Sequence, residues 1–177
     1  ALCHALGVDD EALAIGVQVF SGDADVIPGR GNLFEKNGIR IFLDFAHNEH
    51  GIRAISETVR AFDAKRNIVL MGQAGDRLDK DIEDLVRAVC EMQPARLLAC
   101  ELPGYERGRP SMVVPALIRK FALRYAMPEE AVTIFSSPVE GVKEALEYAR
   151  DGDCLVLLAL TQREEVLAMV REFIAAD

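Results

Sequence analysis

The chain has 177 residues, 50% of them hydrophobic, and a formal net charge of -9 at pH 7. It is long enough to bury a full core without disulfides or metal, so one domain plus a short extra segment is expected. The acidic balance argues against the basic surface that nucleic-acid binding needs, and no apolar run approaches the ~18 residues of a membrane span. We therefore expect no nucleic acid and no membrane among its partners.

The start of the chain predicts a helix that is separate from the rest of the protein. The segment Asp9–Phe20 has helical periodicity, with Asp9 as a candidate N-cap. The next segment, Ser21–Arg30, contains two glycines and a proline, which is typical of a linker. Because the sequence also begins without methionine, we expect a fragment in which residues 1–27 are the end of a preceding domain plus linker and residues 28–177 form a domain of their own.

From Asn32 onward, short β-branched runs alternate with segments of helical periodicity, the pattern of a parallel sheet wrapped by helices. Asn37-Gly38 accepts positive φ at both central positions of a type I′ turn, so the first two strands should form an antiparallel edge hairpin. The expected fold is α/β, a three-layer Rossmann-like sandwich with a mainly parallel six-stranded sheet and helices on both faces. The predicted strands are Asn32–Lys36, Ile39–Phe45, Asn67–Met71, Arg96–Cys100, Val132–Phe135 and Cys154–Leu160, and the predicted helices lie near Gly51–Phe62, Asp79–Glu91, Met112–Ala126, Val139–Arg150 and Gln162–Ala175.

Charged residues gather where these strands end. The second strand runs into Asp44–His50, the third into Gly72–Arg77, the fourth towards Gly104–Pro110, and the last ends at Thr161–Arg163. In open parallel sheets, ligands bind beyond the carboxyl ends of the strands. The sequence therefore predicts a site for a charged small molecule at this edge.

Each group also has a purely structural interpretation. Asp44 and Asn48 are both able to cap the next helix. The segment Gly72–Gly75 lacks the Gly-x-Gly-x-x-Gly fingerprint and the Gly-Lys-Ser/Thr of a phosphate loop. Arg107 and Arg109 fit an ordinary solvated loop equally well. These alternatives stay open at the level of sequence.

Neither a metal site nor a catalytic nucleophile is indicated. His47 and His50 have no third ligand at suitable spacing, and no Ser/His/Asp or Cys/His order has a supporting context, so the catalytic residues stay unknown. The four cysteines fall in apolar stretches without zinc-ligand spacing. We interpret them as reduced packing residues of a cytoplasmic protein.

Three segments, taken in order, resemble the landmarks of the Mur ligase carboxy-terminal (glutamate ligase) domain: Pro28–Glu35, Leu43–Asn48 and Gly72–Arg77. Two further stretches, Gly75–Ile82 and Arg107–Pro110, are most similar to cyanophycin synthetase-like ligases. The match has two departures. Phenylalanine stands at position 45 where tyrosine is usual, and glutamate at position 49 where many relatives have proline.

The resemblance implies an ATP-dependent ligase that activates a carboxylate as an acyl phosphate and joins it to an amino acid through an amide (peptide) bond. ATP and Mg²⁺ would be its cofactors, with the phosphate loop and the magnesium ligands in a central ATPase domain, to whose end residues 1–27 would belong. Missing amino-terminal and central domains, and a small-molecule amino acid or peptide substrate, would be its partners. The fragment alone would be inactive. The alternative is a non-catalytic nucleotide-binding or regulatory α/β module.

The resemblance also implies two sets of binding residues. Asp44 is suited to accept hydrogen bonds from ribose hydroxyls, and the arginines are suited to neutralise phosphate or to hold an acceptor carboxylate. The nucleotide would be bound by Arg30, Asn32, Asp44, His47 and Asn48, and the substrate by Gly75, Asp76, Arg77, Arg107 and Arg109.

Overall fold

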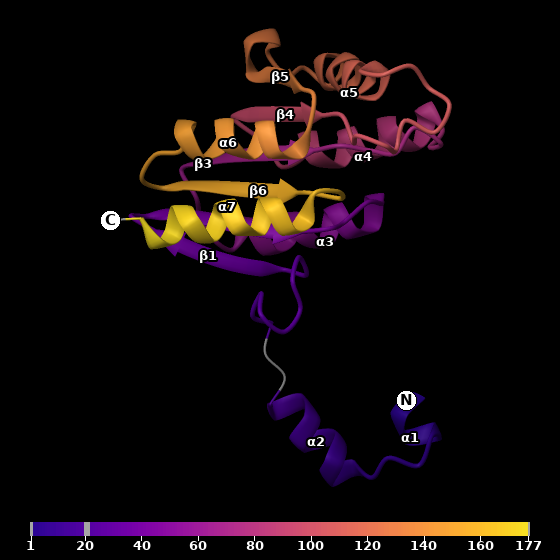
Figure 1. Cartoon of the computed structure of the whole chain (residues 1–177), viewed down its shortest axis with the longest axis vertical. Coiled ribbons are helices and arrows are strands. Elements are labelled where there is room, and N and C mark those ends of the chain that lie inside the picture. Colours follow the sequence, from indigo (N-terminus) through magenta and orange to yellow (C-terminus); the bar gives the residue numbers. More distant parts are fainter. Residues whose placement is uncertain (1, 20–21, 177) are drawn as a thin grey trace.

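A computed structural model of the chain describes residues 2–19 and 22–176. Two short helices, α1 (Leu2–Ala5) and α2 (Asp10–Gln18), lie apart from the sheet (Figure 1). As predicted, Asp9 is the N-cap of α2, and its side chain accepts a hydrogen bond from the Ala12 amide at 2.7 Å. Neither helix contains a buried residue. Phe20 and Ser21, the predicted junction of helix and linker, lie outside the described residues.

The predicted six-stranded, mainly parallel sheet is confirmed, with strand order β1-β2-β6-β3-β4-β5. Among the described residues, only β1 pairs antiparallel to its neighbour; the other four pairings are parallel. Two strands end earlier than predicted, at Asp44 and Leu158, where the polar loops of the sheet edge begin. The strands are β1 (Asn32–Lys36), β2 (Ile39–Asp44), β3 (Arg66–Met71), β4 (Arg96–Cys100), β5 (Val132–Phe135) and β6 (Asp153–Leu158).

The hairpin between β1 and β2 turns at Asn37 and Gly38, whose φ values of 51° and 73° are both positive, as predicted. This turn pairs Asn32 with Leu43. The residues before β1 are thereby brought to the edge at which β2 ends.

Helices cover both faces of the sheet (Figure 1). One face is covered by α3 (Glu49–Arg60), α4 (Asp79–Cys90) and α5 (Val113–Arg124), and the other by α6 (Pro138–Tyr148) and α7 (Arg163–Ala175). Every residue of β6 is buried: Cys154, Val156 and Leu158 join the first core, while Leu155 and Leu157 join the second. A short 3₁₀ turn, Glu129–Ala131, precedes β5.

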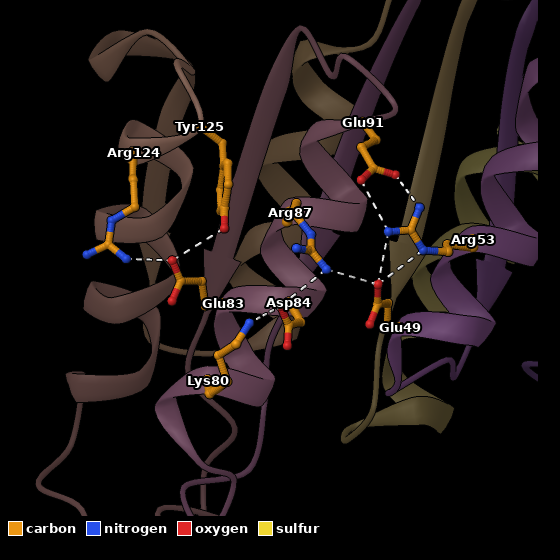
Figure 2. Close-up of polar contacts among 9 residues, drawn as sticks. All are labelled: Glu49, Arg53, Lys80, Glu83, Asp84, Arg87, Glu91, Arg124 and Tyr125. Carbon is orange, nitrogen blue, oxygen red and sulfur yellow. Dashed lines mark hydrogen bonds and ion pairs between the residues drawn. The ribbon is translucent and has the colours of Figure 1, made fainter.

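Ion pairs tie the three helices of the first face together on their solvent side. Figure 2 shows Glu49 of α3 between two arginines, Arg53 at 2.9 Å and Arg87 of α4 at 3.2 Å. On the other side of α4, Glu83 forms an ion pair with Arg124 of α5 and accepts a hydrogen bond from Tyr125 at 3.3 Å. These groups are partly exposed, so they align neighbouring helices more than they hold the core.

The cysteines differ in their surroundings. Burial raises the pKa of Cys90 and of Cys154 to about 11 and raises that of Cys100 still further. All three fit the predicted packing role. The prediction is wrong for Cys3, which is exposed on α1 and packs against no core.

Candidate functional site

The loops at the carboxyl edge surround a cleft of about 440 Å³. The chain leaves β6 for α7 on one face of the sheet, whereas β2 and β3, on either side of β6, lead to α3 and α4 on the other face. Such a reversal opens a crevice beyond the strand ends and is the usual ligand position in this class of sheet. The charged and imidazole side chains that line the cleft are His47, Asp76, Arg77, Asp81, Arg107 and Arg163.

The β3–α4 loop and the β4–α5 loop pack backbone against backbone at this cleft. The Gly75 amide donates a hydrogen bond to the Tyr105 carbonyl oxygen at 2.8 Å. A Cβ atom on Gly75 would lie 1.8 Å from the Glu106 carbonyl oxygen. Glycine at position 75 therefore serves the close approach of the two loops.

Arg109 joins the same two loops through its side chain. Its Nε donates to the Gly75 carbonyl oxygen at 2.6 Å, its Nη1 to Asp79 Oδ1 at 2.6 Å, and its Nη2 to the Arg77 carbonyl oxygen at 2.5 Å. The side chain is 23% exposed and is not part of the cleft lining.

Arg107, two residues earlier, faces the cleft. Its Nη1 donates to Asp76 Oδ2 at 2.5 Å, and its guanidinium lies over the Tyr105 ring, 5.2 Å from the ring centroid. The hydrogen bond from Arg107 is the main reason that the pKa of Asp76 is lowered. Both side chains of the pair are about half exposed, so a ligand can reach them.

Arg77 and Asp81 have no such partners. Within residues 2–19 and 22–176, neither side chain makes a hydrogen bond or an ion pair, and both line the cleft and a smaller hollow of about 200 Å³ beside it. Opposite charges that are free and exposed at a concave site are suited to a ligand that carries both signs.

Asp44 and Asn48, at and after the end of β2, have different structural roles. Asn48 is the N-cap of α3 and accepts a hydrogen bond from the Gly51 amide at 2.9 Å. Asp44 Oδ2 instead accepts from the Gly31 amide at 2.8 Å, across the β1–β2 hairpin. Of the two capping candidates, only Asn48 caps the helix.

The other predicted nucleotide-binding residues are Asn32, whose side chain has a structural role, and Arg30 and His47, whose side chains are exposed. Asn32 is 2% exposed, with its Oδ1 accepting from the Gly29 amide at 2.5 Å and its Nδ2 donating to the carbonyl oxygens of Gly22 and Ile27 at 2.8 and 3.0 Å. The hydrogen bonds of the Asn32 side chain thus hold the segment before β1 in place. Arg30 is exposed at the same edge, and His47 lies in the cleft wall with Nδ1 3.1 Å from the Phe45 carbonyl oxygen.

Two charged cleft residues, Asp81 and Arg163, were not predicted as site residues. Arg163 begins α7; its Nε donates to the Leu160 carbonyl oxygen at 3.1 Å, and its guanidinium stacks on the Phe45 ring at 4.1 Å from the centroid. An arginine shortly after the last strand was a usable signal for this position. Asp81 gave a weaker signal, because an acid in the first turn of a helix commonly serves the helix dipole.

Across the described part of the chain, no group of three metal-ligating side chains occurs. The same residues include no helix long and apolar enough to cross a membrane.

Comparison with known proteins identifies the family. The family model described as "Mur ligase, glutamate ligase domain" matches residues 29–159. This chain belongs to that family. The match covers all four parallel pairings and most of the loops that form the cleft, so the resemblance predicted from three short segments is confirmed.

Curated relatives of this Mur ligase domain are much longer than the chain. A cyanophycin synthetase of Synechocystis sp. is 28% identical over 151 residues, which are 85% of this chain and 17% of that protein. A UDP-N-acetylmuramoyl-L-alanyl-D-glutamate–2,6-diaminopimelate ligase of Gloeobacter violaceus is 28% identical over 155 residues, 86% of this chain and 29% of that protein. The chain therefore spans less than a third of the length of either relative.

A solved structure agrees with the fold. A bifunctional folylpolyglutamate synthase/dihydrofolate synthase of Yersinia pestis, in complex with AMPPNP and Mn ion, matches with a TM-score of 0.67 at 18% identity, over 93% of this chain and 35% of that chain. At this identity the likeness supports the architecture alone.

Proposed function

We propose that this chain is the carboxy-terminal domain of an ATP-dependent ligase that activates a carboxylate as an acyl phosphate and forms an amide bond with an amino acid. The observation that carries the proposal is the cleft at the strand reversal of this Mur ligase family domain. There the side chains of Arg77 and Asp81 make no hydrogen bond or ion pair among the described residues. Arg109 shows the contrast, because its charge is paired with Asp79, whereas Arg77 and Asp81 are exposed in the cleft.

The residues near β2 fit a nucleotide in part. Asp44 uses Oδ2 for the Gly31 amide, so Oδ1 is left as an acceptor for a ribose hydroxyl, and Arg30 and His47 are exposed at the same edge. Asn32 and Asn48 would contribute by shaping the loops, because their side-chain oxygens accept backbone amides. Bound ATP would supply the phosphoryl group, and Mg²⁺, held by the central domain, would neutralise its charge.

The acceptor side of the cleft is suited to a zwitterion. Arg77 would pair with the carboxylate of the incoming amino acid through its fork of donors, and Asp81 would attract its ammonium group. Arg107 is hydrogen-bonded to Asp76 through Nη1 and would offer its other N–H donors at the rim. The amino group, deprotonated to the neutral amine, would attack the acyl carbon. The C–N bond forms, the C–O bond to phosphate breaks, and inorganic phosphate leaves while the nitrogen gives up one further proton to solvent.

The proposal includes the domains that the chain lacks. Residues 1–27 would be the end of a central ATPase domain plus linker, and residues 28–177 the domain that closes over the nucleotide. The absence of buried residues in α1 and α2 and the greater length of the curated relatives support this division. The unpaired thiols support a cytoplasmic location.

Ligation assays with the intact protein test the proposal. We expect ADP release that depends on an amino-acid acceptor, and Arg77→Ala should raise the acceptor KM by about ten- to a hundredfold, the effect of losing a charge-assisted pair. Arg60→Ala, an exposed arginine at the end of α3, is the matched control. The chain by itself should hydrolyse no ATP above background. Nucleotide binding without acceptor-dependent turnover in the intact protein would favour the regulatory module instead.

A further inference from the structure

Arg77 and Arg109 lie on neighbouring loops and differ in how their side chains are used. The Arg77 guanidinium makes no hydrogen bond or ion pair within the described residues, whereas Arg109 uses Nε, Nη1 and Nη2 on acceptors of the β3–α4 loop and the start of α4. One of those acceptors is the carbonyl oxygen of Arg77 itself. Arg109 therefore holds the backbone of the loop that carries Arg77.

We infer that Arg109 is a positioning residue: it locks the β3–α4 loop onto the β4–α5 loop and thereby presents Arg77 to the acceptor. This inference rests on the proposed function. It assigns Arg109 a role different from the substrate contact implied by its motif, and it separates Arg109 from Arg107, which lies in the cleft wall.

The arrangement requires a guanidinium. The carbonyl oxygens of Gly75 and Arg77 and the carboxylate of Asp79 are reached by three different nitrogens of one planar group. A lysine ammonium keeps the charge but is a single point on a flexible stem and lacks this fork. The hydrogen bond to the Gly75 carbonyl oxygen is partly buried, whereas those to Asp79 and to the Arg77 carbonyl oxygen are exposed. Three charge-assisted hydrogen bonds from one planar group hold the loop more firmly than any one of them would.

The loop that carries Arg109 is itself anchored from inside. Glu101, 3% exposed at the end of β4, accepts hydrogen bonds from the Leu102 amide at 3.0 Å and from the Met112 amide at 2.6 Å. This carboxylate ties together the two ends of the β4–α5 loop. Arg109 then connects this anchored loop to the β3–α4 loop, next to the hydrogen bond between Gly75 and Tyr105.

Arg109→Lys in the intact protein tests the inference, with Arg119→Lys as the matched control, because Arg119 of α5 makes one ion pair, with Glu129 of the 3₁₀ turn before β5. Amide hydrogen exchange of residues 72–79 measures how firmly the β3–α4 loop is held. Steady-state kinetics measure the KM for the acceptor and for ATP. For Arg109→Lys we expect exchange about tenfold faster and an acceptor KM about tenfold higher, with the ATP KM within about twofold of wild type. Arg119→Lys should change none of these quantities.

The outcomes separate the possible roles. A raised acceptor KM with unchanged exchange would make Arg109 a ligand contact and overturn the inference. Faster exchange with an unchanged acceptor KM would leave only a structural role and overturn it equally. Absence of acceptor-dependent ADP release in the wild-type intact protein would overturn the proposed function, and the acceptor role of Arg109 with it.

Discussion

Arg66 of β3 donates hydrogen bonds to both carboxylate oxygens of Asp153 of β6, from Nε to Oδ1 at 2.8 Å and from Nη2 to Oδ2 at 2.6 Å. Asp153 is 1% exposed, and its Oδ2 also accepts the Arg150 amide at 2.8 Å. The pair lies at the amino edge of the sheet, opposite the cleft. It fixes the point at which the central strand begins.

Arg66→Ala should therefore destabilise the fold. The substitution leaves a buried carboxylate with only a backbone donor, which costs about 2–4 kcal/mol in the free energy of unfolding. Chemical denaturation measures this difference. Lys65→Ala, which removes an exposed pair with Asp151 next door, should change the free energy little. Equal stability of Arg66→Ala and wild type would mean that the Arg150 amide alone satisfies Asp153.

Asp44→Asn should weaken the use of ATP by the intact protein without unfolding it. The amide oxygen still accepts the Gly31 amide, but the second acceptor oxygen is lost, so the ATP KM should rise by about tenfold, the worth of one hydrogen bond to a charged group. Kinetics with varied ATP measure the effect. Asn48→Ala provides the contrast, because it removes the cap of α3 and should cost about 1 kcal/mol of stability. An unchanged ATP dependence in Asp44→Asn would remove Asp44 from the site.

Gly75→Ala should disrupt the cleft. The added methyl group would lie 1.8 Å from the Glu106 carbonyl oxygen, which is backbone and has no free rotation to escape. We expect a lower melting temperature and a higher acceptor KM. Gly16→Ala is the matched control, since no atom lies within 4 Å of its added Cβ and helix α2 gains about 0.5–1 kcal/mol from alanine. A Gly75→Ala protein with wild-type kinetics would contradict the close approach of the two loops.

Acid should weaken the contact between α3 and α4. The pKa of Glu49 is held below its ordinary value of 4.5, chiefly by the hydrogen bond from Arg53. A lowered pKa stabilises the folded state above the ordinary value, and this stabilisation is lost as pH falls below 4.5 through the folded-state pKa. Melting temperatures from about pH 3 to 7 should decline less steeply for Glu49→Gln than for wild type at the acid end of the range. Glu57→Gln on the same helix should follow wild type, and identical curves for all three proteins would exclude the contribution of Glu49.

The sequence predicted the elements of the fold better than it predicted the roles of single side chains. Positive φ at Asn37-Gly38 and the caps of α2 and α3 are local properties, so they follow from a few adjacent residues. The place of β6 between β2 and β3 is not local, since the pairing of strands depends on how the helices cover the sheet.

The site shows the same limit. The strand ends brought Asp44, Arg77 and Arg109 to one edge, as the parallel topology requires. The sequence did not predict which of these side chains is free to bind a ligand. The hydrogen-bond partners of Arg109 lie 30 to 34 residues away in the chain, in the β3–α4 loop and the first turn of α4. Asn32 is comparable: its amide closes a turn whose shape no local pattern specifies.

The position of β6 has a consequence for synthesis on the ribosome. Both β2 and β3 pair with β6, which is the last strand of the sheet to be made, and not with each other. Until about residue 158 has left the exit tunnel, β2 and β3 each expose an unpaired backbone edge on the side that β6 later joins, together with apolar side chains, as slow-folding, non-local sheets do. Folding of the nascent chain should therefore wait for its carboxy-terminal segment, and a translation product that stops before Asp153 should be a substrate for chaperones and proteases.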